Sequence, residues 1–178
     1  MQKIVLLISL SLLCLCSGIK AQETLIKVNL LSPLVRTGSF FVEHKINDNS
    51  SVQLGLFYTG KTWDDTKVRG WGITPEYRFY LSDSPAPEGF FVAPYLRYFN
   101  FDLEEKFNNN EAKLNSIGGG LIVGQQYIFK KRVSFEWFIG PSYSNIDLDV
   151  KTGKIGDFDT DTWEGFSLRA GITLGLAF

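Results

Sequence analysis

Charged residues occur in this sequence where alternation would place them on one side of a β-strand. They stand between apolar neighbours or lie two residues apart, and the set comprises Glu76, Arg78, Arg97, Glu136 and Arg169. Such groups must pair when they face a space without water, because an unpaired buried charge is costly. The pattern predicts a network of ion pairs and hydrogen bonds inside a β-structure, which Glu43 and Gln53 could join.

A lone histidine, His44, is the next residue that could do chemistry. A serine hydrolase needs such a base within hydrogen-bond reach of a serine, and an acid that orients the ring. Glu43 and Lys45 flank His44, and no serine adjoins it in the sequence. We therefore predict no catalytic residue and interpret His44 as part of a strand surface.

Three aspartates, Asp157, Asp159 and Asp161, alternate in the last long connection. Calcium loops use carboxylates at this spacing around a tight turn. A full calcium loop would carry Gly where Thr162 stands and Glu where Leu168 stands. The sequence predicts a solvated acidic loop, no metal site and no cofactor, and calcium binding at 157–161 stays open as an alternative.

Strands must position all these residues, because apolar residues alternate with small or charged ones in eight segments. In GWGITPEYRFYL, for example, the odd-numbered residues from Trp71 to Phe79 are apolar or aromatic, and Glu76 and Arg78 occupy even-numbered positions between them. Several segments alternate for ten residues or more, whereas strands of soluble proteins usually have about five or six. The segments are residues 24–32, 39–47, 51–60, 69–82, 89–102, 114–128, 132–145 and 165–178.

The connections are short after the second, fourth and sixth segments, and those after the first, third, fifth and seventh generally lengthen along the chain. Membrane-spanning barrels have short turns at one end, long loops at the other, and strands of about 9–11 residues. The prediction is an all-β fold, an eight-stranded antiparallel transmembrane β-barrel in an up-and-down meander.

The first residues resemble a secretory signal. Lys3 precedes an apolar run from Ile4 to Cys16, and Ala21 offers a small residue for cleavage. The run is short for a membrane anchor, and Leu precedes both Cys14 and Cys16, which disfavours lipoprotein processing. We predict a cleaved signal at 1–21 and a barrel domain at 22–178.

Aromatic residues make up 15% of the chain and occur near the ends of the predicted strands. Membrane barrels carry aromatic girdles at both interfaces, whereas aromatics of a soluble core need no such placement. The predicted interface residues are Trp71, Phe79, Phe90, Phe135, Trp137 and Tyr143.

The final strand carries apolar residues on one parity, at Ile172, Leu174, Leu176 and Phe178. In this the chain resembles the small eight-stranded outer-membrane barrels of the OmpA membrane domain and OmpX type. The resemblance covers residues 22–178 and implies that the barrel-assembly machinery reads the last strand. It also implies the cell outer membrane as location and outer-membrane lipid as surroundings.

The predicted function is non-enzymatic, structural or adhesive, and uses the external loops. Loops 59–69, 102–113 and 146–164 are the candidate surfaces for an extracellular or envelope protein partner. Without the signal, 16 basic residues face 19 acidic ones, so the net charge of about −3 disfavours nucleic acid as a partner. A lipid A-modifying enzyme and a small channel through the charged lumen remain the alternatives.

Overall fold

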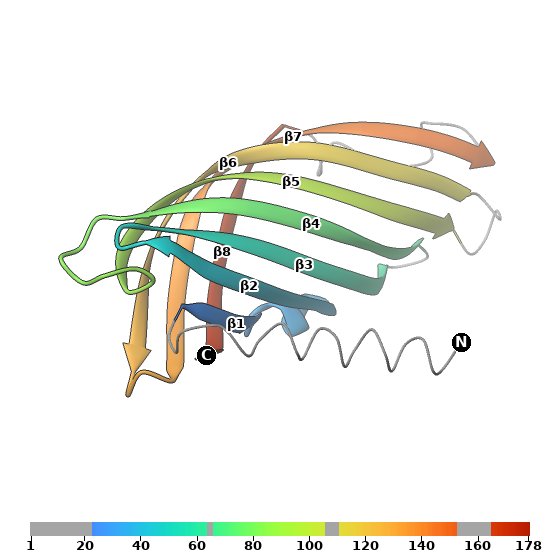
Figure 1. Cartoon of the computed structure of the whole chain (residues 1–178). Coiled ribbons are helices and arrows are strands. Elements are labelled where there is room, and N and C mark those ends of the chain that lie inside the picture. The colour runs from blue at the N-terminus through green and yellow to red at the C-terminus, as the bar shows by residue number, and fades with distance from the viewer. Residues whose placement is uncertain (1–22, 64–65, 106–110, 153–164) are drawn as a thin grey trace, which may run out of the picture.

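The structure, a computed structural model, describes residues 23–63, 66–105, 111–152 and 165–178. Eight antiparallel strands form a closed barrel in which each strand pairs with its sequence neighbours (Figure 1). The predicted fold and all eight strands are confirmed. The strands are β1 (Thr24–Asn29), β2 (Thr37–Asn47), β3 (Ser50–Trp63), β4 (Thr66–Tyr80), β5 (Gly89–Glu105), β6 (Glu111–Phe129), β7 (Val133–Thr152) and β8 (Gly165–Ala177).

A single 3-10 turn, η2 (Ser32–Val35), connects β1 to β2. The predicted first strand therefore ends early, at Asn29 instead of residue 32. The side-chain oxygen of Asn29 accepts a hydrogen bond from the N–H of Leu31 at 2.9 Å, and this local turn takes the chain out of the sheet. Arg36 then reverses the chain with a φ of 55°. No helix in the described part of the chain is long and apolar enough to cross a membrane.

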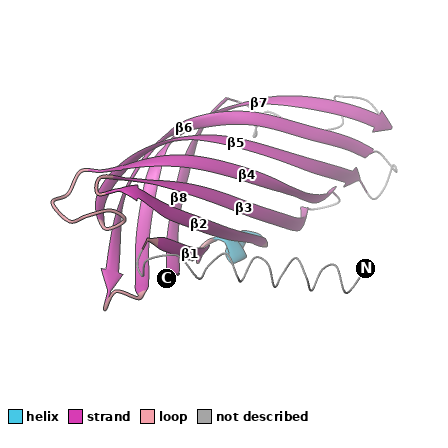
Figure 2. Cartoon of the chain, viewed as in Figure 1, coloured by secondary structure: helices cyan, strands magenta, loops and turns pink. Residues whose placement is uncertain are grey.

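The barrel closes where β1 meets β8. The N–H of Phe178 donates to the carbonyl of Thr24 at 2.8 Å, and β1 pairs with β8 from Leu25 to Asn29. Closure leaves no exposed sheet edge at this level. The turns that follow β2, β4 and β6 lie at the same end as the C-terminus (Figure 2), which we call the inner end, and the opposite end is the outer end.

The outer surface of the barrel is apolar over a belt bounded by two rings of aromatic residues. Side chains from Val133 to Tyr143 cover about 25 Å of barrel height, at about 3.3 Å per residue and a strand tilt of about 40°. This is the height of the apolar band of outer-membrane barrels. The outer ring comprises Tyr58, Trp71, Tyr98, Tyr143 and Phe166, and the inner ring comprises Phe79, Phe90, Tyr127, Phe129 and Phe178.

Beyond the outer ring, the polarity of the two barrel faces is reversed. Outward positions there carry polar residues such as Arg69, Asp102 and Asp147. The inward residues form a buried apolar cluster of Val68, Phe99, Phe101, Leu103, Ala112 and Leu114. A sheet with its apolar face inside and its polar face outside is suited to water on the outside. Strands β3 to β7 therefore extend past the belt as a rim with an apolar core of its own.

The strands of the rim are longer than the sequence predicted, so much of each predicted loop is strand. Strand β3 continues to Trp63 and β4 begins at Thr66, so the range 59–69 is mostly a hairpin. In the same way β5 reaches Glu105, β6 begins at Glu111, and β7 reaches Thr152. Figure 1 shows β5, β6 and β7 reaching much farther than β2 at the outer end.

Candidate functional site

A closed ring of four charged side chains lies inside the barrel near the inner end. Lys27 of β1 contacts Glu43 of β2 at 2.6 Å and Glu136 of β7 at 2.5 Å. Arg78 of β4 contacts the same two carboxylates, Glu136 at 2.8 Å and Glu43 at 3.4 Å. All four side chains are fully buried. Each cation thus bridges both anions, and each anion bridges both cations.

A branch extends this ring toward the outer end. Arg78 donates to Glu76 at 2.9 Å, and Arg169 of β8 donates to the other oxygen of Glu76 at 2.6 Å. Gln53 of β3 donates to Glu76 at 3.0 Å. The branch and the ring together form the ion network: Lys27, Glu43, Glu76, Arg78, Glu136 and Arg169.

Neutral groups complete the hydrogen bonding of the ion network at the inner end. Tyr80 donates to Glu43 at 2.6 Å, and Ser51 donates to the same carboxylate. Gln126 accepts from Lys27 at 2.8 Å and donates to the carbonyl of Pro87 in the turn after β4. The turn thereby closes the inner end beneath the network.

The ion network has three basic groups and three carboxylates, so its formal charges cancel. Desolvation of each ion costs several kcal/mol, and only direct pairing with further hydrogen bonds offsets it. The lumen of an eight-stranded barrel is just wide enough to be filled by side chains. The arrangement is suited to a fixed ionic plug, because every charge is held by at least one opposite charge within 2.9 Å.

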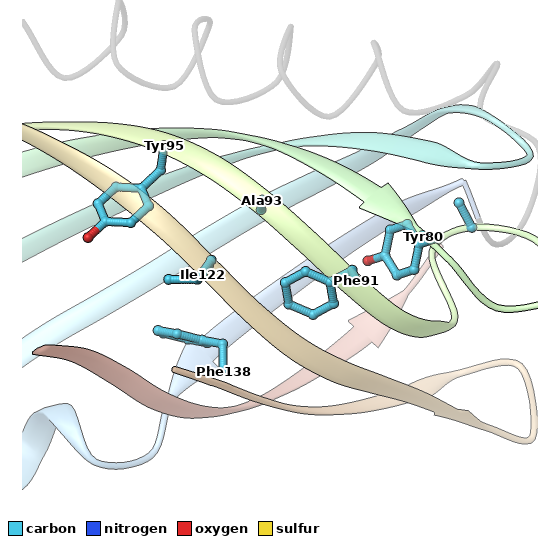
Figure 3. Close-up of a cluster of buried hydrophobic side chains, with 7 residues drawn as sticks. Tyr80, Phe91, Ala93, Tyr95, Ile122 and Phe138 are labelled. Carbon is cyan, nitrogen blue, oxygen red and sulfur yellow. The ribbon is translucent and has the colours of Figure 1, made fainter. Parts of the chain in front are cut away.

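Apolar side chains of β5, β6 and β7 form a buried cluster in the lumen beside the ion network. Figure 3 shows Phe91, Ile122 and Phe138 gathered on the inner side of these strands. Arg78 lies over the ring of Phe91, with its guanidinium carbon 4.4 Å from the ring centre. Glycines on neighbouring strands accommodate such rings: a Cβ at Gly171 would collide with Phe138.

The predicted lumen residues are brought together with one exception. Glu76, Arg78, Glu136 and Arg169 belong to the ion network. Arg97 also points inward, but it makes no ion pair with any residue that the structure describes; it stacks on Phe57 at 4.6 Å. The prediction that Arg97 joins the polar network is therefore wrong, because its neighbours inside the barrel are aromatic rings.

Sequence reasoning missed Lys27 and Gln126, and it named Glu43 only as a candidate. Lys27 stands between Ile26 and Val28, so alternation alone places it opposite to the membrane-facing side chains. That signal was available but weak, because β1 has only six residues. For Gln126, the sequence indicated only that its side chain alternates with the outward-facing residues of the strand.

His44 lies outside the lumen, on the outer surface near the inner end. Its Nδ1 is 2.9 Å from the hydroxyl of Thr24. No carboxylate among the described residues contacts the ring, so the triad geometry of a hydrolase is not formed there. The acidic run 157–161 lies outside the described residues. Within the described residues, no cluster of three or more potential ligands could hold a metal ion.

The predicted interface aromatics all face outward, at different heights. Trp71 and Tyr143 lie in the outer ring, and Phe79 and Phe90 lie in the inner ring. Trp137 lies between the two rings, four residues after Val133 and six before Tyr143. The alternating residues of β8, Ile172, Leu174, Leu176 and Phe178, face outward as well.

Comparison of the sequence with known families gives one match, to a family described as "Protein of unknown function (DUF3575)", over residues 5–155. The chain belongs to the DUF3575 family. No curated protein sequence is significantly similar to this DUF3575 chain.

Solved structures similar to the DUF3575 chain include a major outer membrane protein and a β-barrel domain. A major outer membrane protein from Thermus thermophilus has 16% identity and a TM-score of 0.56, over 90% of this chain and 100% of that one. The N-terminal β-barrel domain of Pseudomonas aeruginosa OprF has 11% identity and a TM-score of 0.50, over 89% and 100%. Acinetobacter baumannii CarO2 has 12% identity and a TM-score of 0.50, over 89% and 98%. These structures share the predicted eight-stranded barrel fold with this chain.

Proposed function

We propose that this protein is a non-conducting, non-enzymatic barrel of the cell outer membrane that binds a protein partner through its rim. The ion network is the observation that carries the proposal. Its four-membered ring joins β1, β2, β4 and β7 across the lumen, and its side chains are fully buried. Ions cannot pass such a ring without breaking charge-assisted hydrogen bonds, which are the strong ones in proteins.

The rim supports a role in partner binding. Its outward face is polar and its inward face is packed, so it forms a stiff surface in water above the belt. Functional residues of proteins on a shared scaffold concentrate in such peripheral segments. Strand β7 beyond Ser144 pairs only with β6 among the described residues, so this part of its backbone could accept an added strand.

Single-channel recording tests the absence of conduction. The refolded protein is inserted into planar bilayers, and its insertion is verified by protease protection. We expect no discrete current steps across the voltage range. Regular steps whose selectivity changes in the variant Glu136→Gln would contradict the proposal and favour the channel.

Two further assays address the enzyme and the partner. Incubation with lipid A, followed by mass spectrometry, is expected to give no deacylated product. A deacylated product that His44→Ala abolishes would establish the enzyme instead.

For the rim, residues 102–113 are replaced by an Asn-Gly turn, which joins Phe101 to Leu114. We expect binding of the nanodisc-embedded barrel to intact cells to be lost, and equal binding by both forms would exclude the β5–β6 rim.

A further inference from the structure

A cavity of about 380 Å³ lies in the lumen between the ion network and the apolar core of the rim. Its wall includes Arg97 and Arg169 together with aromatic residues, of which Phe41, Phe57 and Phe138 are three. Cavities that bind small molecules have volumes of about 300–1,000 Å³ and mostly apolar walls with few polar groups. The volume of this cavity lies in that range, and its wall combines apolar side chains with several polar ones.

The cavity reaches the surface beside η2. Ser32 and Val35 of that turn line it, and Val35 is 52% exposed. A molecule from the outer end can therefore reach the arginines without crossing the ion network.

Each of the two arginines that line the cavity has a hydrogen-bond donor without an acceptor in the part of the chain that the structure describes. Nε of Arg97 and Nη1 of Arg169 are buried and have no acceptor among the described residues. Arg169 uses its other Nη to bind Glu76, and its charge is balanced there. Arg97 is a surplus cation, because the six charges of the ion network cancel without it. An unpaired buried charge is costly, which favours a bound anion.

Aromatic rings hold both guanidinium groups in place. Arg97 lies over Phe57 at 4.6 Å and over Phe99 at 5.8 Å. Arg169 lies over Tyr95 at 4.4 Å and over Phe138 at 5.0 Å. Stacked guanidinium forks are preorganised for an oxyanion such as a carboxylate.

From these observations we infer that the cavity binds a small monocarboxylate with an apolar body. The carboxylate accepts hydrogen bonds from Arg97 and Arg169, and the apolar body packs against Phe41 and Phe57. The single surplus charge matches one carboxylate better than a doubly charged phosphate. The inference is independent of the proposed function, since a barrel with an empty cavity would still be silent in a bilayer.

Calorimetry on the refolded barrel in a non-ionic detergent tests this site with phenylpropionate as the probe. We expect saturable binding that weakens about tenfold or more in Arg97→Gln, because a hydrogen bond to a charged group is lost. Arg69→Gln, which changes an outward arginine of the rim, is the matched control and is expected to bind as the unaltered protein does. Arg97→Lys should restore part of the affinity.

Related probes and a stability measurement separate the possible outcomes. Phenylpropanol and acetate should each bind at least about tenfold more weakly than phenylpropionate, since each lacks one half of the recognised group. No saturable binding, equal binding of the alcohol, a preference for inorganic phosphate, or equal binding by Arg97→Gln would each overturn the inference. The unfolding midpoint of Arg97→Gln should stay equal to or above that of the unaltered protein, which shows that any lost affinity is not lost folding.

Discussion

Replacing Glu136 by glutamine should destabilise the barrel strongly. The carboxylate accepts hydrogen bonds from Lys27 at 2.5 Å and from two nitrogens of Arg78 at 2.8 and 3.0 Å. Glutamine offers one acceptor oxygen and directs an NH₂ group at the remaining donors. The variant also leaves the ion network with one uncompensated positive charge in a fully buried position. Removal of one partner from a buried pair costs about 3–5 kcal/mol, so we expect that loss in the free energy of unfolding.

Equilibrium unfolding in urea, with the barrel in lipid vesicles and tryptophan fluorescence as signal, measures this loss. Asp102→Asn is the matched control. Asp102 contacts Lys113 at 3.9 Å on the rim, where both side chains are about half exposed. Exposed pairs contribute about 1 kcal/mol or less. A loss for Glu136→Gln no larger than that of Asp102→Asn would refute a tightly packed, water-free network.

A double variant separates charge balance from packing. Lys27→Met alone leaves a surplus carboxylate, whereas Lys27→Met with Glu136→Gln restores neutrality in the ion network. We expect the double variant to be more stable than the sum of the two single losses predicts, by about 1–3 kcal/mol. Additive losses would mean that the two side chains do not interact.

Two further predictions concern strand packing and a surface ion pair. Gly120→Ala should lower the free energy of unfolding by about 1–3 kcal/mol, because its Cβ would collide with the carbonyl of Pro141. Gly38→Ala should have little effect in the same assay, because its Cβ would meet only the ring of Phe40, at an ordinary contact distance of 4.0 Å. The hydrogen bond and charge of Lys45 lower the pKa of Asp48, so the stabilisation by this pair is present above the ordinary carboxyl pKa and is lost as the pH falls through the lowered pKa. A carboxyl NMR titration should show the pKa of Asp48 rising in Lys45→Met, and an unchanged value would contradict the pairing.

Alternation in the sequence determined the number of strands, their order and most of their faces. A strand turns successive side chains to opposite sides, so Trp71 and Phe79 face away from Glu76 and Arg78 whatever the rest of the chain does. The same period placed Ile172 to Phe178 on the outer face of β8. The local periodicity of the sequence is therefore sufficient to predict the barrel and its apolar outer belt.

The partners of the charged residues were decided only by the closed barrel. Lys27 and Glu136 are 109 residues apart and meet because barrel closure pairs β8 with both β1 and β7, which brings these two strands close together. Arg97 has the same inward orientation as Arg78, yet it lies closer to the outer end, among aromatic rings and beside a cavity. Height and stagger around a barrel depend on all eight pairings together, and no single strand encodes them.

The rim shows the same division between sequence and tertiary structure. Strand β5 has aromatic residues on both faces: Phe90 and Tyr98 face outward in the belt, Phe91 and Tyr95 face inward between them, and Phe99 and Phe101 face inward at the level of the rim. Alternation continues unbroken through that change. Periodicity states which residues share a face, but only the assembled barrel decides at which height the apolar face turns from the outside to the inside.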